Sequence, residues 1–164
     1  MRFLTPLLLV VLLSGCGYVP SAKFARGILG EHVYVTVEIL ASEPENAVIL
    51  KDAINEALIS RFRVTLSGPK SATSRLNVGI LSLAFIPIEY DSNGYIIGQR
   101  AQITLGIKRT RNNKSKSYSV SGSYDYDVEP NGVVSDADRF LAIKSASLRA
   151  LDALVAKLAV EGVK

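Results

Sequence analysis

The chain has 164 residues, of which 48% are hydrophobic and 21% charged, and its formal net charge is +4. This length and apolar content fit one compact domain, and they exclude a disordered tail, a collagen-like fibre and a multi-domain machine. The single cysteine, Cys16, excludes an intramolecular disulfide framework and a cysteine-based zinc site, since each needs at least two thiols. The basic excess suits an anionic partner but does not choose between nucleic acid, lipid and no partner.

The N-terminal residues have the layout of an export signal. Arg2 precedes an apolar run over residues 7–13, which has the length of a signal-peptide core and is shorter than the ~20 residues that span a bilayer. The run ends in Leu-Ser-Gly-Cys at residues 13–16, which resembles a bacterial lipobox, where the thiol accepts diacylglycerol. We therefore predict that residues 1–15 are a lipoprotein signal peptide and that Cys16 is the lipid attachment site. The alternative is an ordinary small, buried cysteine.

The residues after the lipobox indicate where the protein resides. Gly17 occupies the position at which lipoproteins retained in the inner membrane carry aspartate, so the resemblance implies sorting to the outer membrane. We expect residues 16–30 to form a lipidated tether and residues 31–164 to form a single domain. Because no other long apolar run occurs, this domain is expected to be water-soluble and to face the periplasm.

In the first half of the domain, the spacing of apolar residues changes from every second residue, as in a strand, to a helical period and then back again. Apolar residues alternate over residues 33–39, which predicts a half-buried strand. Residues 46–62 have helical spacing and form an amphipathic helix, and a short strand is expected over residues 63–66. A further strand covers residues 76–86. Its alternation slips between Ile80 and Leu81, as in a β-bulge or in a strand covered on both faces.

The second half predicts two hairpins and a helix. Residues 91–94 read Asp-Ser-Asn-Gly, which is typical of a hairpin turn, and residues 112–114 read Asn-Asn-Lys, which predicts a second turn. The strand between these turns has one dry and one wet face, and residues 117–128 alternate strictly. Ser135 is a predicted N-cap of a final helix. Its apolar stripe consists of Phe140, Ile143, Ser147, Leu151, Leu154 and Leu158, with Leu148 and Val155 beside it.

These elements predict an α+β fold. We expect a two-layer sandwich, in which an antiparallel-rich sheet of about four to five strands has two helices packed on one face, since none of these elements can bury its apolar side alone. The other sheet face carries Arg100, Gln102, Thr104 and a row of serines. This polar face would meet water in a free monomer or a polar wall in a complex.

The sequence offers no convincing catalytic, metal or cofactor site. His32 is the only histidine, and no serine stands in a G-x-S-x-G turn, so a catalytic triad is not expected. Asp125 and Asp127 share one strand face but are more typical of solvating charges, and Asp136 and Asp138 are better explained as helix-capping acids. We therefore expect a protein without enzymatic activity, cofactor or metal.

One cluster of cations stands out around the second turn. It consists of Lys108, Arg109, Arg111, Lys114 and Lys116, with Arg100 further along the preceding strand. Two strands joined at a turn bring such side chains together in space. The cluster is either a solubilising hairpin end or an anion site. For an anion site, a phosphorylated lipid or an acidic protein wall suits a periplasmic protein better than nucleic acid does.

The whole pattern resembles the LptE family of lipopolysaccharide-assembly lipoproteins. The resemblance covers nearly the whole mature chain and rests on Leu-Ser-Gly-Cys-Gly-Tyr at residues 13–18, the hairpin around residues 90–94, the Lys108-Arg109 strand end, the Ser/Tyr-rich strand and the final Ala/Leu helix. It implies a plug inside the β-barrel of an LptD-like outer-membrane partner and binding of lipopolysaccharide during its assembly. The cations named above are then candidate lipopolysaccharide-binding residues. The alternative is a periplasmic lipoprotein that activates or scaffolds a cell-wall synthase or a transporter.

Overall fold

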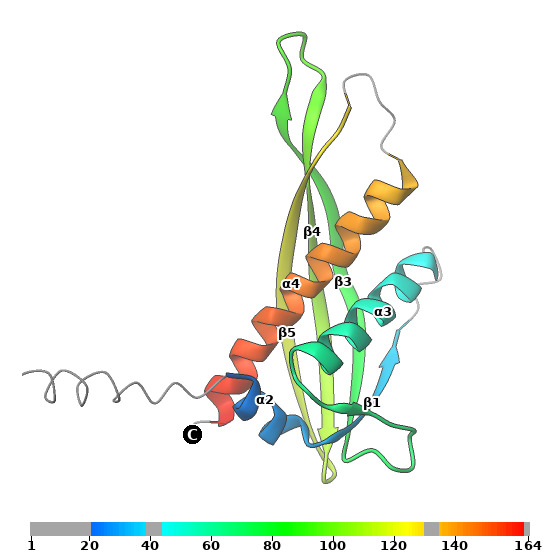
Figure 1. Cartoon of the computed structure of the whole chain (residues 1–164), viewed down its shortest axis with the longest axis vertical. Coiled ribbons are helices and arrows are strands. Elements are labelled where there is room, and N and C mark those ends of the chain that lie inside the picture. The colour runs from blue at the N-terminus through cyan, green and yellow to red at the C-terminus, as the bar shows by residue number, and fades with distance from the viewer. Residues whose placement is uncertain (1–20, 39–43, 130–134, 163–164) are drawn as a thin grey trace, which may run out of the picture.

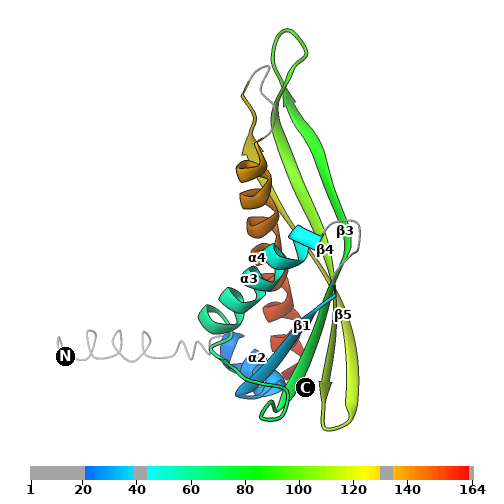
Figure 2. The same ribbon diagram turned by 90° about the vertical axis from the view of Figure 1, so that its right-hand side faces the viewer.

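The protein consists of one β-sheet with helices packed on one side of it (Figures 1 and 2). The computed structural model describes residues 21–38, 44–129 and 135–162. The signal peptide, the lipobox and Cys16 lie outside the described residues, so the leader and its lipidation remain predictions.

Five strands and three helices make up the described residues. Their order along the chain is α2 (Ser21–Leu29), β1 (His32–Val37), α3 (Pro44–Ser60), β2 (Thr65–Leu66), β3 (Ser74–Tyr90), β4 (Ile96–Arg111), β5 (Lys114–Asp127) and α4 (Asp136–Gly162). The sheet order is β2-β1-β3-β4-β5. Strand β1 is parallel to β2 and β3, whereas β3, β4 and β5 are antiparallel.

This architecture confirms the predicted α+β class and corrects two details. Helices α3 and α4 are the two predicted helices. Helix α2 is a third helix, and it lies within residues 16–30, for which the sequence predicts only a lipidated tether. The sheet is mixed because α3 connects β1 to β2 as a crossover, which returns the chain in the same direction. All three helices lie on the same side of the sheet (Figure 2).

The core lies between the helices and the dry sheet face. Ala101, Ile103 and Leu105 of β4 are fully buried, as the alternation of this strand predicts. Leu154 and Leu158 of α4 are buried on the other side of this core, in the helix layer. Burial of each large aliphatic side chain contributes about 1.5–3 kcal/mol relative to exposure, so this face determines on which side the helices pack.

The broken alternation in β3 is a β-bulge. The register between β3 and β4 shifts between Ile80 and Ser82, and the Leu81 side chain is 65% exposed. The strand is therefore not covered on both faces there. The last residues of β3 and the first residues of β4 extend past the helix layer as a long hairpin (Figure 1).

Both hairpin turns are stabilised as their residues predict. The Asp91 carboxylate accepts hydrogen bonds from the backbone N–H groups of Asn93 and Tyr95, at 2.9 and 2.8 Å. In the second turn, Asn112 and Asn113 have φ values of 50° and 58°, which Asn tolerates and which a two-residue hairpin turn requires.

The final helix begins at its predicted cap. The Ser135 hydroxyl accepts a hydrogen bond from the Asp138 backbone N–H at 3.1 Å and donates one to the Asp138 carboxylate at 2.6 Å. The predicted stripe is buried from Ile143 onwards, but Phe140 is 47% exposed. All residues of α4 before Ala142 are exposed, so the predicted burial of Phe140 is wrong.

Strand β5 is the free edge of the sheet on one side, and α4 protects it. Lys157 donates a hydrogen bond to the Ser119 carbonyl at 2.5 Å, and Arg149 donates one to the Ser123 carbonyl at 2.9 Å. An unpaired strand edge otherwise offers these groups to another chain.

We therefore expect the double substitution Arg149→Ala and Lys157→Ala to promote edge-to-edge association. Sedimentation velocity should show a concentration-dependent dimer for this variant. Lys144→Ala, which removes a cation of the same helix that pairs with Glu56 instead, should stay monomeric. A double variant that remains monomeric at all concentrations would contradict this role for the two cations.

Candidate functional site

The β4–β5 turn brings the predicted cation cluster together at one end of the molecule. Lys108 to Arg111 of β4 pair residue by residue with Lys114 to Ser117 of β5. The helix α2 lies beside this end (Figure 1). Successive side chains of a strand point to opposite faces, and directly paired residues share a face, so Lys108 faces outwards while the other four hairpin cations lie on the face that carries the helices.

Arg109 and Arg111 face the helices and hold the end of α2. Arg111 donates to the Gly27 and Ile28 carbonyls at 2.7 and 2.9 Å, and Arg109 donates to the Ile28 carbonyl at 2.8 Å. The last carbonyls of a helix have no partner within it, and cations there also complement the helix dipole. Gly30 closes the helix with a φ of 85°, which favours glycine. These two arginines have a structural role in this fold.

A partly buried ionic network joins the same hairpin to the end of α4. The Glu161 carboxylate accepts hydrogen bonds from Arg109 at 3.1 Å and Tyr118 at 2.7 Å, and pairs with Lys116 at 2.8 Å. Burial acts to raise the pKa of Glu161, but the hydrogen bonds from Lys116 and Tyr118 outweigh it and hold this pKa below its ordinary value. Burial, together with the bond to Glu161, raises the pKa of Tyr118 to about 12. The network therefore fixes α4 against the sheet.

Because of this network, the free energy of unfolding should depend on pH in the alkaline range. Above about pH 10 the unfolded chain loses the Tyr118 proton, whereas the folded chain keeps it up to a pKa of about 12. The free energy of unfolding should therefore fall with rising pH over this interval. Tyr118→Phe should remove this part of the decline in urea denaturation curves. Tyr95→Phe, at an exposed tyrosine of the far hairpin, should retain it. An unchanged decline in Tyr118→Phe would show that Tyr118 does not cause it.

Lys108 and Lys114 are the free cations of the predicted cluster. Both side chains are exposed, and neither has a hydrogen-bond or ion-pair partner among the described residues. Lys108 borders a groove of about 510 Å³ on the outer sheet face. Gly79 of β3 and Gly106 of β4, which pair with each other, also line this groove. Neither residue has a side chain that could fill it.

Arg100 lies apart from the other candidates. It is eight residues from Lys108 along β4, which corresponds to about 26 Å in an extended strand. Its guanidinium donates two hydrogen bonds to Asp125 of β5, at 2.6 and 2.7 Å. These bonds raise the pKa of Arg100 and hold the pKa of Asp125 below its ordinary value. The structure thus gathers five of the six candidates at one end and leaves Arg100 on the outer face in a pair of its own.

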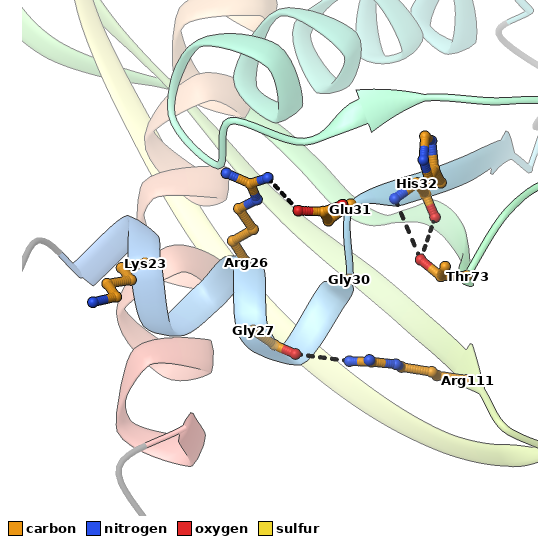
Figure 3. Close-up of a pocket in the computed structure, with 8 residues that line it drawn as sticks. All are labelled: Lys23, Arg26, Gly27, Gly30, Glu31, His32, Thr73 and Arg111. Carbon is orange, nitrogen blue, oxygen red and sulfur yellow. Dashed lines mark hydrogen bonds and ion pairs between the residues drawn. The ribbon is translucent and has the colours of Figure 1, made fainter.

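A second pocket at this end contains cations that the sequence patterns do not single out. It has a volume of about 520 Å³ and lies between α2, the start of β1 and Arg111 (Figure 3). Lys23 and Arg26 of α2 line it, and Arg26 pairs with Glu31 at 2.6 Å. The signal that could have revealed them is the helical spacing of Phe24, Ala25 and Ile28 in residues 21–29, which is interrupted by glycine.

The described residues show no arrangement typical of catalysis. His32 is exposed at the start of β1, where its backbone exchanges hydrogen bonds with the Thr73 hydroxyl at 3.3 and 2.7 Å. Within residues 21–38, 44–129 and 135–162, no three side chains among His, Cys, Asp and Glu are grouped so that they could hold a metal. The helices described here also include none that is long and apolar enough to cross a membrane.

Two solved structures have the same fold. The crystal structure of the rare lipoprotein B from Shewanella oneidensis aligns with a TM-score of 0.51 at 12% identity, and covers 80% of this chain and 96% of its own. A putative lipoprotein from Caulobacter crescentus aligns with a TM-score of 0.52 at 13% identity, and covers 87% of this chain and 98% of its own. A sequence search of curated proteins found no match.

The family assignment comes from the sequence itself. The family model LptE, described as lipopolysaccharide-assembly, matches residues 34–158. This range runs from Tyr34 in β1 to Leu158 in α4, so it includes all of β2 to β5 and α3 and most of β1 and α4. The resemblance inferred from the lipobox and the hairpins is therefore confirmed: the chain belongs to the LptE family of lipopolysaccharide-assembly proteins.

Proposed function

We propose that this protein is a non-enzymatic outer-membrane lipoprotein that plugs and supports an LptD-like β-barrel and binds lipopolysaccharide during its assembly. The uncovered outer face of the sheet is the observation that carries the barrel contact. The three described helices all cover the other face, so among the described residues the outer face is left to meet either water or a partner (Figure 2). Family membership supports lipopolysaccharide assembly as the process that this contact serves.

The outer face has the chemistry of a barrel lumen. Thr104 of β4 and Ser121 of β5 bond to each other across this face at 2.9 Å, and Gln102 is exposed beside them. The interior of an outer-membrane barrel is polar, so these hydroxyl and amide groups can form hydrogen bonds with it. The long β3–β4 hairpin extends the same face beyond the helices (Figure 1).

Cross-linking in cells tests the barrel contact. A photoreactive residue at Gln102 on the outer face should form an adduct with a large heat-modifiable outer-membrane protein. The matched control is a photoreactive residue at Ser71, which is exposed in the loop before β3 at the opposite end of the sheet from the long hairpin. A cell-wall synthase or a transporter component as the main adduct of Gln102 would favour the alternative function and contradict the plug.

Lipidation is tested at Cys16. Replacing Cys16 by alanine removes the thiol that accepts the lipid, so mass spectrometry of this variant should find no acyl chain. Mass spectrometry of the wild-type protein should find residues 1–15 absent and acyl chains on Cys16. A bare thiol with the leader still attached would contradict the anchor.

A further inference from the structure

The charges of the protein are separated along its long axis. One end, here called the basic end, consists of residues 21–32, 63–75 and 108–116, and contains ten lysines and arginines; the acids there are Glu31 and Glu161, which reaches in from the end of α4. The opposite end consists of residues 89–100, 125–129 and 135–139, and contains seven acids but two basic residues. Figure 1 shows that α2, the loop before β3 and the β4–β5 turn lie together, far from the long hairpin and the start of α4.

The basic end presents cations that the fold does not use. Lys23 of α2 and Lys70 of the loop before β3 are exposed, and neither has a hydrogen-bond or ion-pair partner among the described residues. Figure 3 shows Lys23 directed away from the other side chains of the pocket. Arg75 is also exposed, and within the described part of the chain its side chain donates a single hydrogen bond, to the Pro69 carbonyl at 3.1 Å. Lys23 and Lys70 come from elements outside the β4–β5 hairpin that carries the candidate lipopolysaccharide residues Lys108 and Lys114, whereas Arg75 of β3 pairs with Thr110 and is a neighbour of Lys108.

The N-terminus places this end next to the membrane. Helix α2 begins at Ser21, five residues after the proposed lipid attachment site Cys16. Five residues reach at most ~17 Å even when fully extended. With Cys16 acylated, the start of α2 therefore stays within that distance of the headgroup region, and the rest of the basic end lies beside α2 (Figure 1). The opposite end carries net negative charge and would be repelled by the same surface.

We propose that the basic end binds the anionic phospholipid headgroups of the membrane that holds the lipid anchor. This inference rests on the proposed lipidation of Cys16. A phosphodiester headgroup supplies the negative charge that Lys23, Lys70 and Arg75 lack within the fold, and a lipid chain combined with a basic patch is a common form of two-part membrane attachment. Screening limits the attraction to about 8 Å at physiological ionic strength, so it acts only at the end that the tether keeps close.

Vesicle binding by the whole mature chain carrying Cys16→Ser tests this surface without the anchor. The chain should co-sediment with vesicles of phosphatidylcholine and phosphatidylglycerol but not with phosphatidylcholine alone, and high salt should release it. The double variant Lys23→Glu and Lys70→Glu should bind at least about 25-fold more weakly, since each cation near such a surface contributes about fivefold.

A matched variant separates position from net charge. Lys51→Glu with Lys144→Glu makes the same change in net charge on α3 and α4, and should bind these vesicles as the wild type does. Equal losses in the two double variants, or no preference of the wild type for phosphatidylglycerol, would overturn the proposal. So would a loss of lipopolysaccharide binding in Lys23→Glu and Lys70→Glu with unchanged vesicle binding. Acylation of Cys16 is read separately by mass spectrometry, so a failed anchor and a failed basic end are distinguishable.

Discussion

Gly122→Ala should destabilise the protein by about 3 kcal/mol, at the upper end of what an overpacked core costs. Gly122 lies on β5 where α4 crosses the strand. A Cβ atom there would overlap the Ala146 carbonyl oxygen and the Ala150 backbone nitrogen, which are backbone atoms and cannot rotate away. The helix would have to move off the sheet and would separate Leu151 and Leu154 from their neighbours. Urea denaturation followed by circular dichroism measures this change.

Gly68→Ala is the matched control for this substitution. A Cβ at Gly68 would meet no atom within 4 Å, so its free energy of unfolding should change little. If Gly122→Ala were as stable as Gly68→Ala, the close contact between α4 and β5 would be wrong, and so would the account of how the helix layer is positioned.

Charge reversal at Lys108 and Lys114 should weaken lipopolysaccharide binding roughly 100-fold. These are the two candidate cations that have no hydrogen-bond or ion-pair partner among the described residues, so each is free to bind a lipid phosphate. A hydrogen bond to a charged group contributes about 1.5–3 kcal/mol, and two such bonds at the lower value correspond to this change in affinity. Fluorescent lipopolysaccharide titrated with the mature chain carrying Cys16→Ser, with and without Lys108→Glu and Lys114→Glu, provides the measurement.

Two comparisons give this experiment its specificity. Lys51→Glu with Lys144→Glu has the same net charge and should bind as the wild type does. Arg109→Met and Arg111→Met should lower the free energy of unfolding, because these arginines hold the last carbonyls of α2. Unchanged binding after charge reversal at Lys108 and Lys114 would remove the hairpin from the lipopolysaccharide site.

Much of the fold follows from local patterns. The strict alternation in β4 and β5 correctly predicts which side chains face the helices, because a two-residue period leaves only one way to bury Ile103 and Leu105. The turns at Asp91 and Asn112 and the cap at Ser135 are also predictable, since each depends on hydrogen bonds or dihedral angles within a few residues.

Other features depend on contacts that are distant in the sequence. Helix α2 contains Gly27 and is only nine residues long, so its stability comes from burial of Ala25 and Leu29 and from the arginines more than 80 residues away. Within the cation cluster, spacing correctly indicates that the side chains gather. It does not reveal that Glu161 and the α2 carbonyls occupy Arg109 and Arg111, because those partners come from other elements.

The amount of lipopolysaccharide on the cell surface after depletion of this protein tests the central claim most directly. If the protein supports a barrel that delivers lipopolysaccharide, surface lipopolysaccharide should fall as the protein is depleted, and a plasmid copy of the wild type should restore it. Normal surface lipopolysaccharide in fully depleted cells would contradict the account.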